Sequence, residues 1–395
     1  MNRSIILVGL TTFQATVLRV LCAAVLCGIL AAGLWPFHAP KNQVSWFSGE
    51  NGILLGDYGS LLSASALKQS NSNEGVCLEV WLEVNAINDA GTILSFYSTD
   101  RDSTSFALRQ SLDDVALVRK SSQDKSRAKA SRIYGQHVFR DGNPVFLTIS
   151  SGKQGTAIYV NGNLAKIVSE FRFSNKDLTG KLVVGNSSVT TDTWSGRLRG
   201  LAIYDRQLTA SQVAQNYQSW LGNGRPEILA FDGTVALYLF NEGAGNAVHN
   251  LVDSTTDLVI PQRFFVLHEP FLERPWNEYY PGWFYWKDVG VNIAGFIPLG
   301  FLFYAYFLLR RRLEYSAAVT IACGFAVSLT IEVLQAFLPT RNSGMTDLIT
   351  NTFGTGLGVM LCAWVVKQNW LAQARVSGDS ATEEVRDDAQ LAGRL

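Results

Sequence analysis

The sequence has no surplus of charge of either sign and little histidine. In 395 residues, 33 Lys and Arg balance 33 Asp and Glu, so the net charge is zero. A nucleic-acid-binding protein normally carries a basic surplus, so we exclude that class. The four histidines are scattered without the spacing of metal ligands, and no phosphate-binding Gly-rich loop or nucleophile elbow occurs. The sequence therefore assigns no metal ligands and no cofactor.

Cysteine is also scarce, with five in the chain. Four of them lie in long apolar runs: Cys22, Cys27, Cys323 and Cys362. Cys77 is then alone in the polar part of the chain, which excludes a disulfide within that part.

Apolar residues, by contrast, are abundant and gathered in runs. The chain is 47% hydrophobic and only 17% charged. Four runs are about long enough to cross a bilayer as helices: residues 20–37, 289–309, 315–340 and 346–366. Glu332 and Asp347 are the only charges inside the third and fourth runs. The sequence therefore predicts four membrane spans.

The first run allows two interpretations. A short charged start, an apolar core and the small residues 31–33 fit a cleavable signal peptide. The aromatic cluster at 34–37 instead fits a retained anchor that ends at a membrane interface. The pattern favours the retained anchor.

The basic cluster Arg310, Arg311 and Arg312 sets the expected orientation, because basic loops stay in the cytoplasm. The segment between the first two spans and the loop 339–345 are then extracytoplasmic. The tail after Lys367, rich in Asp, Glu, Ser and Ala, is predicted to be cytoplasmic and disordered.

The segment from about 41 to 287 consists of short alternating runs separated by Gly, Asn, Asp and Ser, which is typical of an all-β sandwich. Strands are expected at 77–84, 92–97, 146–149, 181–185 and 196–204. A hairpin is expected at 157–167 through Asn161-Gly162, and a short helix at 209–217 with Thr209 as its N-cap.

Several of these runs, in this order, resemble the laminin-G and concanavalin A-like lectin/glucanase group. They are Glu-Val-Trp-Leu-Glu-Val from Glu79, Ile-Tyr-Val-Asn-Gly-Asn from Ile158, Leu-Val-Val-Gly-Asn from Leu182 and Gly-Arg-Leu-Arg-Gly-Leu-Ala-Ile-Tyr-Asp from Gly196. The resemblance implies a jelly-roll sandwich over about residues 43–262. Residues 235–245 are similar to the strand that normally opens this domain but follow its closing strand. We therefore predict a permuted sandwich in which 235–240 pairs near the domain start.

Glucanases of this superfamily carry Glu, Asp and Glu on one strand face. The nearest match, from Glu79 to Glu83, lacks the central Asp. The Cα atoms of Glu79 and Glu83 are about 13 Å apart, which exceeds the separation of the two carboxyl groups that glycosidases use. A solvated strand face is therefore expected, and binding is favoured over cleavage. Trp194 and Trp220 are candidates for stacking on a sugar, although each could equally be a core residue. The resemblance allows calcium in the sandwich without assigning its ligands.

Ionisable residues inside a membrane are costly, so Glu332 and Asp347 are candidate functional, including catalytic, positions. Helical spacing gives them polar neighbours on the same helix face, and all these groups lie near the outer ends of the spans. We predict one polar cluster of Asn292, Ser328, Glu332, Gln335, Arg341, Asp347 and Asn351. Gly354 and Gly358 form a GxxxG pair that allows close helix packing.

These motifs, in order across three spans, resemble the VanZ-like membrane family. They are Asn292-Ile-Ala-Gly-Phe-Ile-Pro-Leu-Gly, Ser328-Leu-Thr-Ile-Glu-Val-Leu-Gln, Arg341 and Asp347-Leu-Ile-Thr-Asn-Thr-Phe-Gly. The resemblance covers about residues 285–366, with the first span as the remaining helix, and favours retention of that span. It implies a small bundle of the bacterial cell envelope. The named member of the family is linked to low-level glycopeptide-antibiotic resistance.

The predicted fold is a mixed membrane protein in which an all-β, concanavalin A-like jelly-roll sandwich is inserted into an α-helical bundle of four spans. Expected boundaries are 1–40 for the N-terminal tail and first helix, 41–270 for the sandwich, 271–288 for a linker, 289–366 for the VanZ-like helices and 367–395 for the tail.

Two functions are carried forward. In the first, a multi-pass protein of the bacterial inner membrane displays a sandwich that binds cell-surface or exported polysaccharide. In the alternative, the chain is an enzyme acting on a lipid-linked envelope precursor in the outer leaflet. Glu332 would then be the general base, Arg341 would hold a phosphate or carboxylate, and Asp347 with Asn351 would orient substrate or hold a metal. The same side chains could instead hold the bundle together by hydrogen bonds between helices.

Overall fold

A computed structural model of the chain describes residues 2–68, 75–98, 103–120, 130–226, 233–279, 282–310 and 315–392. Arg311 and Arg312, which help to set the expected orientation, lie outside these ranges. The chain forms two compact units. The sandwich unit comprises His38–Pro270 and Leu338–Arg341, and the helical unit comprises Met1–Phe37, Phe271–Phe337 and Asn342–Leu395.

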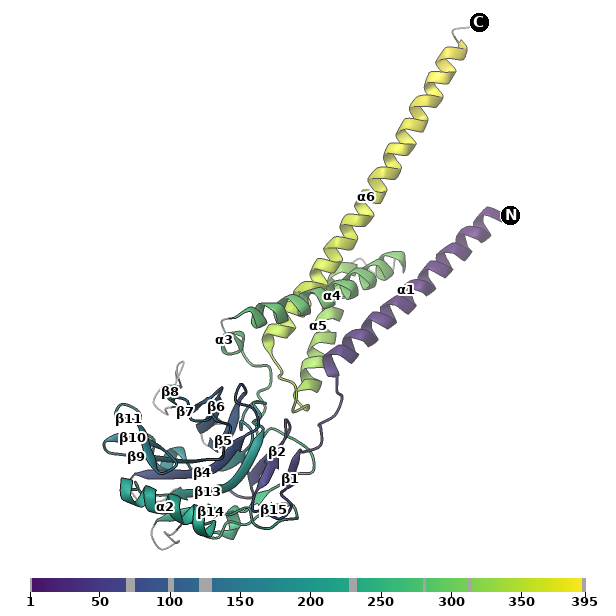
Figure 1. Ribbon diagram of the computed structural model, residues 1–395. Coiled ribbons are helices and arrows are strands. Elements are labelled where there is room, and N and C mark those ends of the chain that lie inside the picture. Colours follow the sequence, from purple (N-terminus) through teal and green to yellow (C-terminus); the bar gives the residue numbers. More distant parts are fainter. Residues whose placement is uncertain are drawn as a thin grey trace. The chain divides into compact units, whose positions relative to one another are not determined.

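The sandwich unit consists of two antiparallel sheets, each with eight strands in the described residues (Figure 1). The first sheet has the order β1 (Val44–Trp46), β2 (Ile53–Leu55), β13 (Gly196–Tyr204), β4 (Val76–Val84), β9 (Val145–Gly152), β10 (Gly155–Val160) and β11 (Asn163–Val168), with β14 (Thr234–Tyr238) also on β13. The second has the order β15 (Ala247–Val248), β16 (Leu258–Val259), β3 (Leu61–Ser63), β12 (Lys181–Val184), β5 (Ala90–Ser98), β6 (Ser103–Ser111), β7 (Asp114–Arg119) and β8 (Ser131–Gly135). Among its described residues, the unit also contains the 3₁₀ turns Asn175–Asp177 and Ser254–Thr256. The predicted antiparallel sandwich is confirmed.

The core lies between the two sheets because alternate residues of each strand point inward. On β4 the inward residues are Val76, Leu78, Val80 and Leu82, all fully buried. Phe96 and Phe106 meet them from the second sheet. The other face of β4 therefore carries Cys77, Glu79, Trp81 and Glu83 together.

The hairpin and the permutation appear as predicted. Asn161 and Gly162 both have positive φ, 50° and 77°, as a type I′ turn requires. Strand β14 pairs antiparallel with β13, with Ala202 opposite Leu237. The amide of Gly52, next to β2, donates to the carbonyl of Phe240 over 2.7 Å. Residues 235–240 thus join the sheet beside the first strands of the domain, as predicted.

Helix α2 (Ala210–Asn223) covers part of the outer face of the first sheet. It begins at the Thr209 N-cap, as predicted, and ends at Gly224, whose φ is 63°. Val213, Asn216 and Trp220 are its buried residues. They form a second core layer with residues such as Cys77 and Phe146. Where α2 lies, the sheet is therefore buried on both faces.

The helical unit contains α1 (Asn2–Leu34), α3 (Pro275–Glu278), α4 (Trp283–Arg310), α5 (Ser316–Gln335) and α6 (Met345–Ala392). Within the described residues, four helical segments are long and apolar enough to cross a membrane: Gln14–Leu34, Trp283–Leu309, Ser316–Gln335 and Met345–Gln368. They coincide with the four predicted spans. Helix α6 continues to Ala392, through the tail expected to be disordered, because this segment is rich in Ala, Glu, Gln and Arg and lacks proline.

Glycines bring α4 and α6 together. A Cβ atom on Gly354 would lie 2.2 Å from the carbonyl oxygen of Ile293, and one on Gly358 would lie 2.2 Å from that of Ile297. Across the same contact, a Cβ on Gly300 would lie 2.1 Å from the carbonyl oxygen of Thr355. The predicted GxxxG pair therefore faces another helix at backbone contact.

Candidate functional site

Glu79 is not part of a solvated strand face, which corrects the prediction made from the sequence. Its side chain is fully buried beneath α2. One carboxylate oxygen accepts hydrogen bonds from the Tyr204 hydroxyl (2.8 Å) and the Trp220 indole N–H (3.2 Å). The other accepts from the Asn216 amide (3.0 Å). Loss of solvation raises the pKa of Glu79, and the three hydrogen bonds oppose that rise.

Trp194 and Trp220 are core residues, so neither can stack on a sugar. Their exposed fractions are 1% and 0%. The Trp194 indole donates to the Gln110 side chain over 2.8 Å, and that of Trp220 donates to Glu79. Burial of a large aromatic with its N–H paired is the usual state of such side chains.

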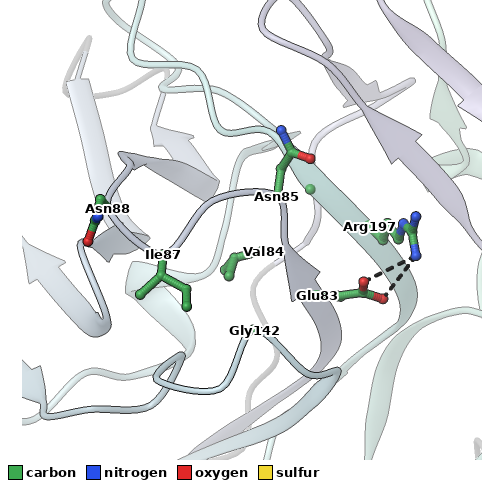
Figure 2. A pocket seen from close by; sticks show the side chains of 8 residues that line it. Glu83, Val84, Asn85, Ile87, Asn88, Gly142 and Arg197 are labelled. Atoms are coloured by element: carbon green, nitrogen blue, oxygen red, sulfur yellow. Dashed lines mark hydrogen bonds and ion pairs between the residues drawn. The ribbon is translucent and has the colours of Figure 1, made fainter.

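Beyond α2, the outer face of β4 and β13 carries aromatic and charged residues. With two residues from the segment between β1 and β2, they form what we call the outer strip: Phe47, Glu50, Trp81, Glu83, Arg197 and Arg199. Strand register places Glu83 opposite Arg197 and Trp81 opposite Gly200. The Arg197 guanidinium contacts both oxygens of Glu83, at 3.1 and 3.4 Å (Figure 2). Arg199 contacts one oxygen of Glu50 at 2.9 Å.

Aromatic rings hold both arginines of the strip. The guanidinium carbons of Arg197 and Arg199 lie 5.5 and 5.6 Å from the centre of the Phe47 ring. That of Arg199 also lies 6.0 Å from the Trp81 ring. These distances suit cation–π contacts, which limit how far a guanidinium can turn.

Two pockets open along this strip. The first, shown in Figure 2, has a volume of about 520 Å³ and is lined by Glu83, Arg197, Asn85, Asn88 and their neighbours. The second, of about 510 Å³, is lined by Glu50, Trp81, Arg199, Leu221 and their neighbours. Both volumes fall within the usual range of ligand pockets, roughly 300 to 1,000 Å³. The outer strip thus combines an aromatic surface, charged donors and acceptors, and space for a ligand.

Folding also brings together one group that the sequence spacing had hidden. Asp113, Asp114 and His137 place one ligand atom each within 4.8 Å of one another and could hold a metal ion. The His137 ring nitrogen lies 2.6 Å from Asp113, and its backbone N–H donates to Asp114 over 2.8 Å. The hydrogen bond from His137 lowers the pKa of Asp113. The turn between β6 and β7 supplies the two aspartates, and the turn after β8 brings His137 to them from a distant part of the sequence.

In the helical unit, the predicted polar residues form pairs between helices. The Asn292 amide on α4 donates to Asp347 on α6 over 2.8 Å. The Asn351 amide on α6 donates to the Ser328 hydroxyl on α5 over 3.0 Å. Ser328 and Asn351 are buried. Four of the seven predicted residues are therefore joined across α4, α5 and α6.

Glu332 and Gln335 bond to backbone groups instead. The Glu332 carboxylate is buried and accepts from the amide of Gly344 over 2.8 Å, just before α6 begins. The Gln335 amide donates to the carbonyl of Gly33 at the end of α1 over 2.9 Å. Each contact ties the C-terminal end of α5 to another segment of the helical unit.

Arg341 lies in Leu338–Arg341, which belongs to the sandwich unit, whereas the other six predicted residues lie in the helical unit. There the Thr191 hydroxyl donates to the carbonyl of Pro339. Glu278, which the sequence reading missed, lies in the helical unit and accepts a hydrogen bond from the amide of Thr346 over 3.0 Å. The sequence feature that could have identified Glu278 is its position shortly before the apolar run of α4.

Hydrogen bonding within the polar cluster leaves two acceptors unused. The side-chain oxygens of Gln335 and Asn351 are buried and have no hydrogen-bond partner. The existing pairs serve to hold helices together, whereas an unpaired oxygen can accept a hydrogen bond from a bound group.

Two segments of the chain match known families. Residues 55–214 match the concanavalin A-like lectin/glucanases superfamily. Residues 234–366 match the VanZ/LLP1 family. Among curated protein sequences, none matches the chain.

Several solved structures are similar to the chain at low identity. The receptor binding domain of botulinum neurotoxin D is 12% identical, with 46% of this chain and 47% of that one covered and a TM-score of 0.35. The serotype D ligand binding domain in complex with N-acetylneuraminic acid is 14% identical, with 47% and 48% covered and a TM-score of 0.35. A SAP-like pentraxin from Limulus polyphemus is 15% identical, with 57% and 95% covered and a TM-score of 0.34. The chain thus spans about half the length of the neurotoxin domains, and these similarities assign it no ligand. Residues 55–214 are thus similar to one family and residues 234–366 to another, and the concanavalin A-like similarity precedes the VanZ/LLP1 similarity in the chain.

Proposed function

We propose that this chain is a multi-pass protein of the bacterial inner membrane whose sandwich is extracytoplasmic and binds cell-surface or exported polysaccharide through the outer strip. The observation that carries the proposal is the half-buried Trp81 beside Arg199 and Glu50 at the wall of a pocket of about 510 Å³. Sugars present apolar C–H faces and hydroxyl groups, which suit an aromatic ring flanked by charged donors and acceptors.

Binding is preferred over cleavage because of Glu79. A glycosidase needs two carboxyl groups that both reach the scissile bond. Glu79 is fully buried and its oxygens accept three hydrogen bonds, whereas Glu83 is paired with Arg197. The two cannot flank one glycosidic bond.

The retained first helix and the orientation are part of the proposal. The bond from Gln335 to the carbonyl of Gly33 gives α1 a partner at the outer end of α5. The basic residues after α4 favour a cytoplasmic loop there, which puts the sandwich on the opposite side of the membrane.

The test uses the full-length protein in lipid nanodiscs and a panel of bacterial envelope and exported polysaccharides. Trp81→Ala is expected to weaken binding at least about tenfold, which corresponds to 1.4 kcal/mol. Tyr134→Ala is the control, because Tyr134 is an exposed aromatic on β8 of the other sheet. Equal binding by Trp81→Ala and the parent protein, or no binding to any member of the panel, would contradict the proposal.

A second candidate function concerns the helical unit: action on a lipid-linked envelope precursor in the outer leaflet. It is favoured by the buried Asn351 oxygen without a partner, one turn from Asp347 on α6, and by the burial of Glu332. Glu332 is the proposed base, and Asp347 with Asn351 would orient the substrate. Glu332→Gln keeps the shape and an acceptor for the Gly344 amide. Loss of precursor turnover with unchanged thermal stability would support ionisation chemistry, and unchanged turnover would exclude Glu332 as the base.

A further inference from the structure

We propose that the pocket around Arg199 takes the carboxylate of an acidic sugar unit, so that the ligand is a uronic-acid-containing polysaccharide. The inference rests on the proposed glycan binding and goes further by naming the ligand's chemical class. It begins from the two arginines of the outer strip, which differ in how their hydrogen bonds are satisfied.

Arg197 has a fixed partner. It lies on β13 directly opposite Glu83 on β4, and one of its nitrogens contacts both carboxylate oxygens. The Glu83 side chain is only 20% exposed and sits on a central strand of the sheet. Replacing this partner with a ligand would leave a partly buried carboxylate without its cation.

Arg199 has an incomplete and exposed partner. A single oxygen of Glu50 contacts a single terminal nitrogen of Arg199. The Nε atom of Arg199 is buried and has no hydrogen-bond partner. The Glu50 side chain is 64% exposed, against 21% for Arg199. Exposed ion pairs of this kind contribute only about 0 to 1 kcal/mol, so a ligand carboxylate can replace Glu50 at low cost.

The guanidinium itself stays in place when its partner changes. The Arg199 guanidinium lies over the faces of the Phe47 and Trp81 rings, which restrict its movement. The edge of the guanidinium is then left for hydrogen bonding. A guanidinium edge presents two parallel N–H donors that match the two oxygens of a carboxylate. A carboxylate that takes two donors of Arg199 makes a bidentate contact, whereas Glu50 makes a single one.

The remaining walls of the pocket suit a sugar ring. Trp81, Pro144 and Leu221 provide apolar surface, and Asn51 provides an amide. An aromatic and aliphatic wall next to one cation fits a ring whose face is apolar and whose edge carries a carboxylate. Glu50 then competes with the carboxylate of the ligand for Arg199.

The experiment measures binding of polygalacturonate, alginate and hyaluronan to the full-length protein in nanodiscs. Each is compared with its carboxyl-reduced form, which keeps the chain but removes the charge. We expect at least one acidic form to bind tenfold or more tightly than its reduced form. Arg199→Gln should abolish this difference, and Arg132→Gln, at an exposed arginine on β8 of the other sheet, should keep it. Glu50→Gln should increase affinity for the acidic form several-fold, which a purely structural role for the Glu50–Arg199 pair would not produce.

The outcomes separate the inference from the function on which it rests. Equal binding of acidic and reduced forms, with Trp81→Ala still impairing both, would overturn the acidic ligand and leave glycan binding standing. Tighter binding of dextran sulfate than of every carboxylated polysaccharide would also overturn it. No binding of any polysaccharide would overturn both. If Arg199→Gln does not fold, Glu50→Gln and the comparison of charged with reduced ligands decide the question.

Discussion

The indole nitrogen of Trp220 lies 3.2 Å from the carboxylate of Glu79, so a residue of α2 donates a hydrogen bond to an acid buried on β4. Tyr204 and Asn216 complete the set of donors. The acid and its partners join the helix to the outer face of the sheet. This polar contact lies within the second core layer of the sandwich.

Glu79→Ala should lower the free energy of unfolding of the sandwich by about 3 kcal/mol, because three buried donors lose their acceptor. Urea unfolding followed by tryptophan fluorescence measures this change. Gln215→Ala, at an exposed position of α2, is the control and should unfold with the parent protein. Unchanged stability in Glu79→Ala would mean that the buried donors find other partners.

The same residue should make stability depend on pH. Burial raises the pKa of Glu79, so the folded state keeps a proton that the unfolded state has already released. The resulting stabilisation is complete below the ordinary glutamate pKa and is lost as pH rises through the folded-state pKa. Glu79→Gln cannot ionise and should show a weaker decline in unfolding free energy above about pH 4.5.

Glu269 should make the unfolding free energy still depend on pH in the Glu79→Gln variant. Its burial raises its pKa to about 7, which gives a contribution of the same sign in both proteins. The double variant Glu79→Gln with Glu269→Gln should therefore be flatter than either single variant. Parallel pH profiles for the parent and Glu79→Gln would contradict the role given to Glu79.

The hairpin between β10 and β11 should be sensitive at Gly162. Its φ of 77° is unfavourable for any residue with a Cβ atom, and that atom would lie 3.0 Å from the Tyr217 ring. Gly162→Ala should lower stability by about 1 kcal/mol or more. Gly222→Ala is the matched control, since Gly222 is in α2 with open space around it and should gain a few tenths of a kcal/mol. Thermal unfolding of both variants gives the comparison.

Packing of α4 against α6 should depend on Gly354 and not on Gly356. A methyl group at Gly354 would meet the carbonyl of Ile293 at 2.2 Å, whereas Gly356 has nothing within 4 Å. We expect Gly354→Ala to cost about 1 to 3 kcal/mol, seen as a lower midpoint of thermal aggregation in detergent. Gly356→Ala should match the parent. Equal midpoints for both variants would mean that α4 and α6 do not approach as closely as described.

Local sequence patterns were sufficient for the strands, the turn at Asn161-Gly162, the α2 cap and the four spans. Each depends on residues close together in the chain, whose spacing matches the period of a strand or a helix. The pairing of residues 235–240 with the sheet was predictable because an out-of-place strand motif is itself a local pattern.

The site was less predictable, because it depends on which surfaces become covered. Strand alternation in the sequence shows that Glu79 and Glu83 share one face of β4. It does not show that α2 covers Glu79 and leaves Glu83 partly exposed. Trp194 and Trp220 are of a residue type that often binds sugars, but folding buries both in the core. Trp81, Glu50 and Arg199 meet only after folding, since they come from three distant parts of the chain.

The first and last segments of the sandwich are bonded to each other. The amide of Asn42 donates to the carbonyl of Gln262, and the amide of Phe264 donates to that of Pro40, with Lys41 and Arg263 paired between them. Bonded strands lie about 5 Å apart, which is also the span of a tight turn. The chain thus enters and leaves the segment 40–264 at neighbouring points, and Leu338–Arg341 joins the same unit from a later part of the sequence. A turn joining Pro40 to Phe264 should therefore leave the order of α1, α4, α5 and α6 unchanged.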